Sequence, residues 1–159
     1  MCLTCSIIKN EKIPPGGVIY KNGEVIIHHC IDVNVPGYLV VSSIRHVGEY
    51  QELTDKELIT IARILKSIVG ILYKISGVEK VYILNFAEQT KHFHFHIFPR
   101  YSWMIDKTNI ELFSGELLDG AKLFSYYRRE NKLDDLVIEP QISKTIDFIK
   151  CQLSDSLQL

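Results

Sequence analysis

The sequence has no excess of either charge. Its 18 Lys and Arg residues are balanced by 19 Asp and Glu residues, for a formal net charge of −1. A protein that binds nucleic acid through the phosphate backbone usually shows a clear basic excess, because each phosphate contact needs a cation. The charge balance therefore argues against nucleic acid as a partner.

Long apolar runs are missing as well. The first twenty residues, MCLTCSIIKNEKIPPGGVIY, lack the run of roughly 7–15 apolar residues that marks a secretory signal. Further along, Lys or Arg interrupts the longest apolar segments well before the about 20 residues of a membrane span. We therefore expect a cytoplasmic protein that has no membrane partner.

Cysteine is scarce, with four residues in a chain of 159. Cys2 and Cys5 are spaced as CxxC, whereas Cys30 and Cys151 stand alone, so a framework of structural disulfides is not indicated. In a reducing compartment a CxxC pair more often binds a metal or takes part in redox chemistry. Repeats and low-complexity linkers are also absent, and this length with 47% hydrophobic residues suits a single packed domain.

Short apolar segments predict the strands. GVIYKNGEVIIHH, residues 17–29, is typical of two strands joined at Asn22-Gly23, the sequence pattern of a tight type I′ hairpin. VPGYLVVSS, residues 35–43, predicts a turn and a third strand. KVYILNF, residues 80–86, and KHFHFHIF, residues 91–98, predict two more, separated by a bend short enough for antiparallel pairing.

A capping box opens the longest predicted helix. In TDKE, Thr54 and Glu57 have the spacing that lets each side chain bond the backbone of the other. Apolar residues then recur every three or four positions, which predicts an amphipathic helix that ends near Gly77. A second apolar stripe on this helix has two open interpretations, additional core or a subunit interface; it consists of Ile64, Gly70 and Ile71.

These segments predict an α+β fold, an antiparallel sheet of about five strands with the long helix packed on it. Residues 102–159 are more polar, and their pattern predicts a mostly helical C-terminal extension with helices near 115–130 and 143–153. We expect this extension to pack on the same domain as residues 1–101. Its aromatic residues either cap a ligand pocket or pack on the sheet: Trp103, Phe113, Phe124, Tyr126 and Tyr127.

The segment HFHFHIFPR places three histidines at alternate positions of a predicted strand. Side chains on a strand alternate between faces, so His92, His94 and His96 share one face while the phenylalanines between them point into the core. A lone histidine on a strand is usually a hydrogen-bonded surface or core residue, but three in register call for a chemical reason. Two reasons compete, a metal site and a nucleophilic or acid–base histidine row for an anionic substrate.

These residues carry a resemblance to a known family. HFHFHIF resembles the His-φ-His-φ-His-φ-φ motif of the histidine-triad (HIT) superfamily of nucleotide hydrolases and transferases, where φ is apolar. CLTCSII resembles the CxxC opening of many HIT proteins, and PGYLVVSSIRH resembles one of their strands. The resemblance covers roughly residues 2–101 and implies a HIT-like core over residues 1–101, with no bearing on the extension.

The resemblance implies a nucleotide-conjugate hydrolase or nucleotidyl transferase that cleaves at the α-phosphate. His94 would be the nucleophile and become transiently nucleotidylated, before water releases the nucleoside monophosphate. His96 would hydrogen-bond the phosphate or the leaving group. Uncharged donors around the phosphate oxygens would come from Asn85, Gln89 and Thr90.

The resemblance also implies a metal and a partner. In zinc-bearing HIT proteins a structural ion is held by residues that correspond here to Cys2, Cys5, His46 and His92. HIT proteins are commonly homodimers, so a homodimer is expected here.

The sequence departs from the family at the nucleoside contact. The acidic residue that commonly contacts ribose is replaced by Cys30, and Asp32 is the nearby candidate to substitute for it. One alternative is therefore a nucleotide-binding regulatory module in which hydrolysis is incidental. Another is a catalytic metal bound directly by the three histidines.

Overall fold

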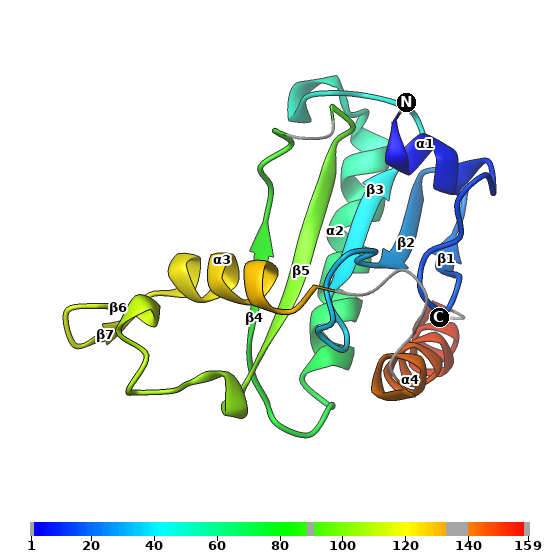
Figure 1. Ribbon diagram of the computed structural model, residues 1–159. Helices are drawn as coiled ribbons and strands as arrows, with labels where there is room; N and C mark the ends of the chain where they lie inside the picture. The colour runs from blue at the N-terminus through cyan, green and yellow to red at the C-terminus, as the bar shows by residue number, and fades with distance from the viewer. Residues whose placement is uncertain (1, 89–90, 133–139, 158–159) are drawn as a thin grey trace.

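The computed structural model describes residues 2–88, 91–132 and 140–157. Five antiparallel strands form one sheet in the order β1-β2-β3-β5-β4 (Figure 1). The strands are β1 (Val18–Lys21), β2 (Val25–His29), β3 (Leu39–Ser43), β4 (Val78–Leu84) and β5 (His94–Tyr101). The α+β fold with a five-stranded antiparallel sheet is thus confirmed; β3 is its central strand, and β5 lies between β3 and the edge strand β4.

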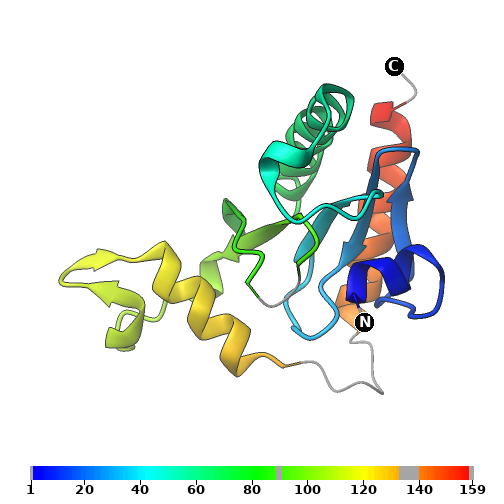
Figure 2. The same ribbon diagram turned by 90° about the horizontal axis from the view of Figure 1, so that it is seen from above.

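Helices cover both faces of the sheet (Figure 2). The long helix α2 (Asp55–Leu72) and the C-terminal helix α4 (Pro140–Leu157) pack on one face, and α3 (Gly120–Glu130) packs on the other. A short helix that the sequence pattern did not predict, α1 (Leu3–Ile8), lies at the N-terminal end. None of the helices in the described ranges has the length and apolar character needed to cross a membrane.

The capping box begins α2 as predicted. Thr54 Oγ1 accepts a hydrogen bond from the Glu57 amide, and the Glu57 carboxylate accepts one from the Thr54 amide in return. The helix ends at Leu72 rather than near Gly77, because the chain turns before that glycine, which has a φ of 86°. The predicted start of the helix was therefore correct, whereas its predicted end lay about one turn too far along the chain.

The second stripe on α2 belongs to the core. Ile64 and Ile71 are 2% and 3% exposed and lie in the cluster between α2, α4 and the sheet, whereas Gly70 is exposed. Of the two interpretations, the structure thus supports core packing for both isoleucines. The homodimer stays a prediction and takes no support from this stripe.

Two local predictions were inaccurate. The β1–β2 turn is not type I′, because neither Asn22 nor Gly23 has a positive φ; instead the Asn22 side chain accepts hydrogen bonds from the amides of Glu24 and Val25. Strand β5 begins at His94, whereas the predicted strand began at Lys91, so His92 lies before the strand. This shift lets His92 turn away from the other two histidines.

The C-terminal extension packs on both sides of the sheet. Ile149 and Leu153 of α4 belong to the same core cluster as α2, and Leu123 and Phe124 of α3 belong to the cluster on the opposite face. Before α3 the extension contains a small hairpin, β6 (Phe113–Ser114) and β7 (Leu117–Leu118), which adds strand to a region predicted as mostly helical. Both helices thus contribute buried residues to the clusters on the sheet, and the division into a core over residues 1–101 and an extension over residues 102–159 stays a prediction.

Truncating a buried residue of α4 tests whether the extension packs on the same domain. We expect Ile149→Ala to lower the free energy of unfolding by about 2–5 kcal/mol, because the side chain is fully buried and its removal leaves a cavity. Lys144→Ala, at an exposed position of the same helix, should change it by less than about 0.5 kcal/mol. Urea denaturation measures both; an Ile149→Ala effect no larger than that of the control would contradict integral packing of α4.

Candidate active site

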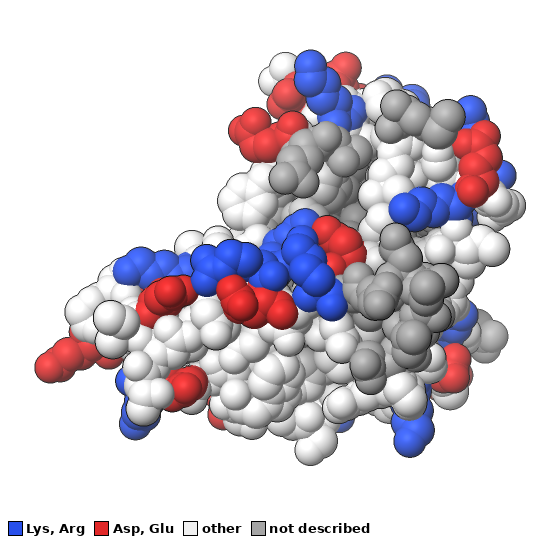
Figure 3. All heavy atoms as spheres, viewed as in Figure 1, with Lys and Arg blue, Asp and Glu red and all other residues white. Residues whose placement is uncertain are grey.

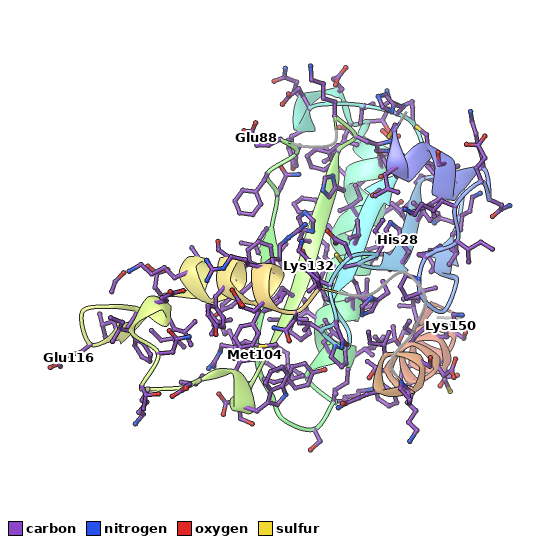
Figure 4. The ribbon with its side chains drawn as sticks, viewed as in Figure 1. His28, Glu88, Met104, Glu116, Lys132 and Lys150 are labelled. Carbon is purple, nitrogen blue, oxygen red and sulfur yellow. The ribbon has the colours of Figure 1, made fainter. Side chains whose placement is uncertain are left out.

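A cavity of about 410 Å³ opens on the α3 side of the sheet. Its floor consists of His28, Val40, His94 and His96, which point to this face because side chains alternate along β2, β3 and β5. Figure 4 labels His28 on β2 and Lys132 after α3 on the viewer-facing side of the sheet, with Glu88 after β4 at its upper end. The cavity volume lies in the range of small-molecule sites.

His94 and His96 face each other on the cavity floor. Their ring centroids are 4.7 Å apart at an interplanar angle of 80°, and their Nε2 atoms are 3.1 Å apart. Residues two apart on a strand are separated by about 6.5 Å along the backbone, so the two rings lean together. Both residues are 9% exposed, which leaves them accessible from the cavity.

The hydrogen bonds of the two rings determine where their protons lie when both are neutral. His94 Nδ1 is 2.7 Å from the backbone oxygen of His92, which only accepts, so Nδ1 of His94 carries the proton. His94 Nε2 is then unprotonated, and His96 Nε2–H donates to it. His96 Nδ1 is consequently an acceptor, for the Tyr38 hydroxyl at 2.9 Å.

Burial keeps two imidazoles of the cavity floor, His28 and His96, neutral. It lowers the pKa of His96 to about 3, and His94 and Arg128 act in the same direction. It lowers the pKa of His28 to about 4, although the hydrogen bond from His28 Nδ1 to the His29 oxygen opposes this shift. His28 Nε2 has no hydrogen-bond partner among the residues that the structure describes.

Cys30 and Asp32 lie together at one wall of the cavity. The Cys30 thiol donates to Asp32 Oδ1 at 3.1 Å, and burial raises the pKa of this thiol to about 12, so it stays protonated. Asp32 Oδ2 lies 3.5 Å from Arg128 Nη2 and 3.8 Å from Lys132 Nζ. The structure thus brings the predicted substitute carboxylate to the cavity, beside two cations.

The three predicted phosphate donors are placed differently from one another. Asn85 is not among the residues lining the cavity; its Nδ2 donates to the His94 backbone oxygen at 2.6 Å. This bond holds the strand that carries His94, and a substrate contact of Asn85 stays a prediction. Gln89 and Thr90 lie outside the described residues.

Four potential metal ligands meet just beyond the C-terminal end of β3. The Sγ atoms of Cys2 and Cys5 and one ring nitrogen each of His46 and His92 all lie within 4.8 Å of one another. Cys5 Sγ lies 3.2 Å from His46 Nδ1 and 3.6 Å from His92 Nδ1. Ligands of a tetrahedral zinc ion are roughly 3.5 Å apart, so the four side chains fit such an ion.

The remaining contacts of His92 also suit a metal ligand. Its Nε2 lies 2.8 Å from the Ser43 backbone oxygen, so this nitrogen carries the proton and Nδ1 presents its lone pair to the cysteines. A ligating histidine commonly donates its other N–H to a carbonyl in this way. His92 thus belongs to the metal-type cluster, and His94 and His96 belong to the cavity.

The sequence analysis gave no functional role to Tyr38 or Arg128. Tyr38 was taken only as part of a strand motif, and Arg128 was not considered, because nothing in its sequence surroundings distinguishes it from other surface arginines. Phe124 was left between two interpretations; it lines the cavity and also packs edge-on against Tyr38 and Phe98. The other aromatic residues considered in the extension are not among the residues lining this cavity.

Comparison with known sequences assigns the chain to a family. The family model of the HIT domain matches residues 11–103, more than half of the chain. An uncharacterized HIT-like protein of Methanocaldococcus jannaschii is 31% identical over 106 residues, which cover 64% of this chain and 80% of that relative. The protein therefore belongs to the HIT family, as the histidine motif predicted.

Solved structures share the fold at low sequence identity. A zinc-bound histidine triad family protein from Mycobacterium smegmatis has a TM-score of 0.64 at 13% identity, covering 99% of this chain and 96% of that one. Plasmodium falciparum diadenosine triphosphate hydrolase has a TM-score of 0.59 at 15% identity, covering 90% and 80%. Both matches extend beyond residues 11–103, so their alignments include much of the C-terminal extension.

The lowered pKa values of His28 and His96 predict a loss of stability in acid. An unfolded histidine has a pKa of about 6.5, so below this pH the unfolded chain binds protons that the native state does not. The native state therefore has its full stability above pH 6.5, and this stability declines as the pH falls toward the pKa values that His28 and His96 have in the folded protein. Each group contributes a slope of up to about 1.4 kcal/mol per pH unit.

We expect the free energy of unfolding to decline between pH 6.5 and 5, as measured by urea denaturation at closely spaced pH values. His28→Phe keeps an aromatic ring that cannot be protonated and should make the decline shallower. An unfolding free energy that stays constant from pH 7.5 to 5 would contradict the burial of two neutral imidazoles.

Proposed function

We propose that the protein cleaves nucleotide conjugates at the α-phosphate through a nucleotidyl-His94 intermediate. Dinucleoside polyphosphates and nucleoside phosphoramidates are substrates of this class. Membership of the HIT family supports the general activity, and the fold is shared with a diadenosine triphosphate hydrolase. The observation that carries the proposal is the position of His94, whose unprotonated Nε2 lies on the floor of the cavity.

The geometry of His94 suits nucleophilic attack. The Nε2 lone pair forms a bond to the α-phosphorus, and the bond from phosphorus to the leaving group breaks. A polyphosphate leaving group departs as an anion through its oxygen, whereas the amine of a phosphoramidate departs after taking a proton from solvent. The bound ring then carries a positive charge, which the His92 backbone oxygen stabilises at Nδ1–H. Water next attacks phosphorus, the phosphorus–nitrogen bond breaks, one water proton passes to solvent, and the nucleoside monophosphate leaves.

His96 supplies a hydrogen-bond donor beside the reacting atoms. Its Nε2–H points to His94 Nε2 in the free protein, where the phosphorus would bind. When substrate arrives, this N–H turns to a phosphate or leaving-group oxygen, on which negative charge grows in the transition state. His96 keeps its proton in this role, because a neutral imidazole is a poor acid.

The walls of the cavity match the two parts of a nucleotide. The aromatic rings of Phe86 and Phe124 are stacked at a centroid distance of 5.9 Å at its edge and offer an apolar surface for a base. The Asp32 carboxylate, which also lines the cavity, can accept hydrogen bonds from ribose hydroxyls. This assignment gives Asp32 the part that Cys30 cannot fill as a protonated thiol.

Replacing the nucleophile tests the proposal. His94→Ala should abolish release of nucleoside monophosphate from diadenosine triphosphate and from adenosine phosphoramidate, a loss of at least about 10⁴-fold in kcat. Intact-mass spectrometry of the rapidly quenched wild-type reaction should show one nucleotidyl group, and peptide mapping should place it on His94. Thermal unfolding of the variant checks that the fold is retained.

The same experiment distinguishes hydrolysis from binding alone. A nucleotide-binding regulatory module would bind these nucleotides without forming an adduct and would lose no turnover in the variant. Either unchanged turnover by folded His94→Ala or an adduct on a different residue would reject the proposed function.

We further propose that Cys2, Cys5, His46 and His92 hold a structural zinc ion. Two thiolates and two imidazoles form a closed donor set that leaves no position for substrate. Such an ion would join the N-terminal residues to the end of β3 and to the residue that precedes β5. A zinc-bound protein of the same fold supports the assignment.

Metal analysis tests the zinc site independently of activity. The purified protein should contain about one zinc per chain by inductively coupled plasma mass spectrometry, and Cys5→Ser should lose it and unfold at a lower temperature. Cys151→Ser, which changes an exposed cysteine on α4, should keep the ion. His94→Ala should keep it too; loss of zinc in this variant with retention in Cys5→Ser would indicate instead a metal held by the three histidines.

A further inference from the structure

One cation from the C-terminal extension reaches the cavity. The Arg128 side chain is 26% exposed and comes from α3, whereas the floor of the cavity comes from the central strands. Basic side chains gather over α3 with acidic ones beside them (Figure 3). Among the described residues that line the cavity, Arg128 is the only Lys or Arg.

Three contacts hold the Arg128 guanidinium in place. Nη1 donates to the Tyr38 hydroxyl at 3.0 Å, Nη2 lies 3.5 Å from Asp32 Oδ2, and the group lies 5.9 Å from the centre of the Phe124 ring. The contact to Tyr38 is the shortest of the three, and Tyr38 is fully buried. The guanidinium therefore acts on a hydroxyl that water does not reach.

The Tyr38 hydroxyl connects Arg128 to the proposed active site. An arginine can only donate, so its N–H occupies a lone pair of the Tyr38 oxygen. The tyrosine proton then needs an acceptor, and His96 Nδ1 at 2.9 Å is the acceptor among its hydrogen-bonded neighbours. Burial raises the pKa of Tyr38, so the hydroxyl keeps the proton that it donates.

We propose that Arg128 is a positioning residue that acts through Tyr38 to keep the His96 proton on Nε2, facing His94. The inference rests on the proposed function for its catalytic consequence. If Tyr38 turned its proton elsewhere, His96 would carry its own proton on Nδ1 and face His94 with a lone pair. Two lone pairs at 3.1 Å would repel each other, and the donor for the departing oxygen would be lost.

The groups at the two ends of this hydrogen-bond array require the same donor and acceptor assignment between them. At one end the His92 backbone oxygen can only accept from His94, and at the other the Arg128 guanidinium can only donate to Tyr38. Between these ends, the two neutral rings and the hydroxyl have one arrangement in which every bond has a donor and an acceptor. The C-terminal extension thus fixes one end of an array whose other end is the backbone before β5.

Nuclear magnetic resonance of the histidine side chains tests the array without any substrate. Long-range ¹⁵N–¹H correlation distinguishes imidazole protonated at Nε2 from imidazole protonated at Nδ1. We expect His96 to be Nε2–H in the wild type and to lose this preference in Arg128→Gln and in Tyr38→Phe. Arg129→Gln removes the neighbouring arginine, which is 61% exposed and pairs with Glu111 and Glu130, and should leave the His96 signals unchanged.

Steady-state kinetics tests the catalytic consequence with the same variants. Arg128→Gln and Tyr38→Phe should each lower kcat by about 10- to 100-fold, the usual effect of removing a partner that orients a functional histidine, with KM changed less than threefold. The double variant should be about as slow as the slower single variant, because both changes break one array. Arg129→Gln should retain wild-type kcat and KM.

The outcomes separate this inference from the proposed function. A nucleotidyl-His94 adduct with wild-type kcat in both folded variants would reject the role of Arg128 and leave the proposed function intact. An increase in KM alone for Arg128→Gln, or additive losses in the double variant, would show instead that Arg128 binds substrate directly and would also overturn the positioning role. Failure of the His94 experiment, with the expected tautomer change, would reject the proposed function alone.

Discussion

The alternation of side chains along β5 is the constraint on which the site depends. It places His94 and His96 on the cavity face while Phe95 and Ile97 point to the core beneath α2, so packing of one face orients the rings of the other. A shift of one residue in the pairing of β3 with β5 would bury both imidazoles under α2 and expose the core residues to the cavity. The apolar core and the proposed chemistry therefore require the same register.

His92 connects two sites that the sequence motif presents as one row. Its ring faces the two cysteines and His46, while its backbone oxygen accepts the proton of His94 Nδ1. Whatever holds the ring of His92 in place therefore also holds the carbonyl that orients the proposed nucleophile. The metal-type cluster would contribute to the proposed active site in this indirect way, since a closed donor set leaves no position for substrate.

The two ends of the chain meet the sheet from different sides and still serve one site. α1 carries Cys5 to the cluster beside His92, α4 completes the core under α2, and α3 brings Phe124 and Arg128 to the cavity. α3 and α4 therefore add buried residues to opposite faces of the sheet. Tyr38 is buried beneath α3 and hydrogen-bonds both Arg128 and His96, so Arg128 on α3 is connected to His96 through the Tyr38 hydroxyl.

The sequence by itself determined the α+β class, the start of the long helix, the HIT family and the residues of the Cys/His cluster, because these depend on local periodicity, capping and short motifs. It also indicated that His94 and His96 share a face, since alternation on a strand is a local property. Only the tertiary structure decided that Ile64 and Ile71 belong to the core, that Asn85 holds the backbone of β5 and that Arg128 and Tyr38 complete the hydrogen-bond array. These contacts join residues up to 90 positions apart, and no local pattern records which face of the sheet a distant helix covers.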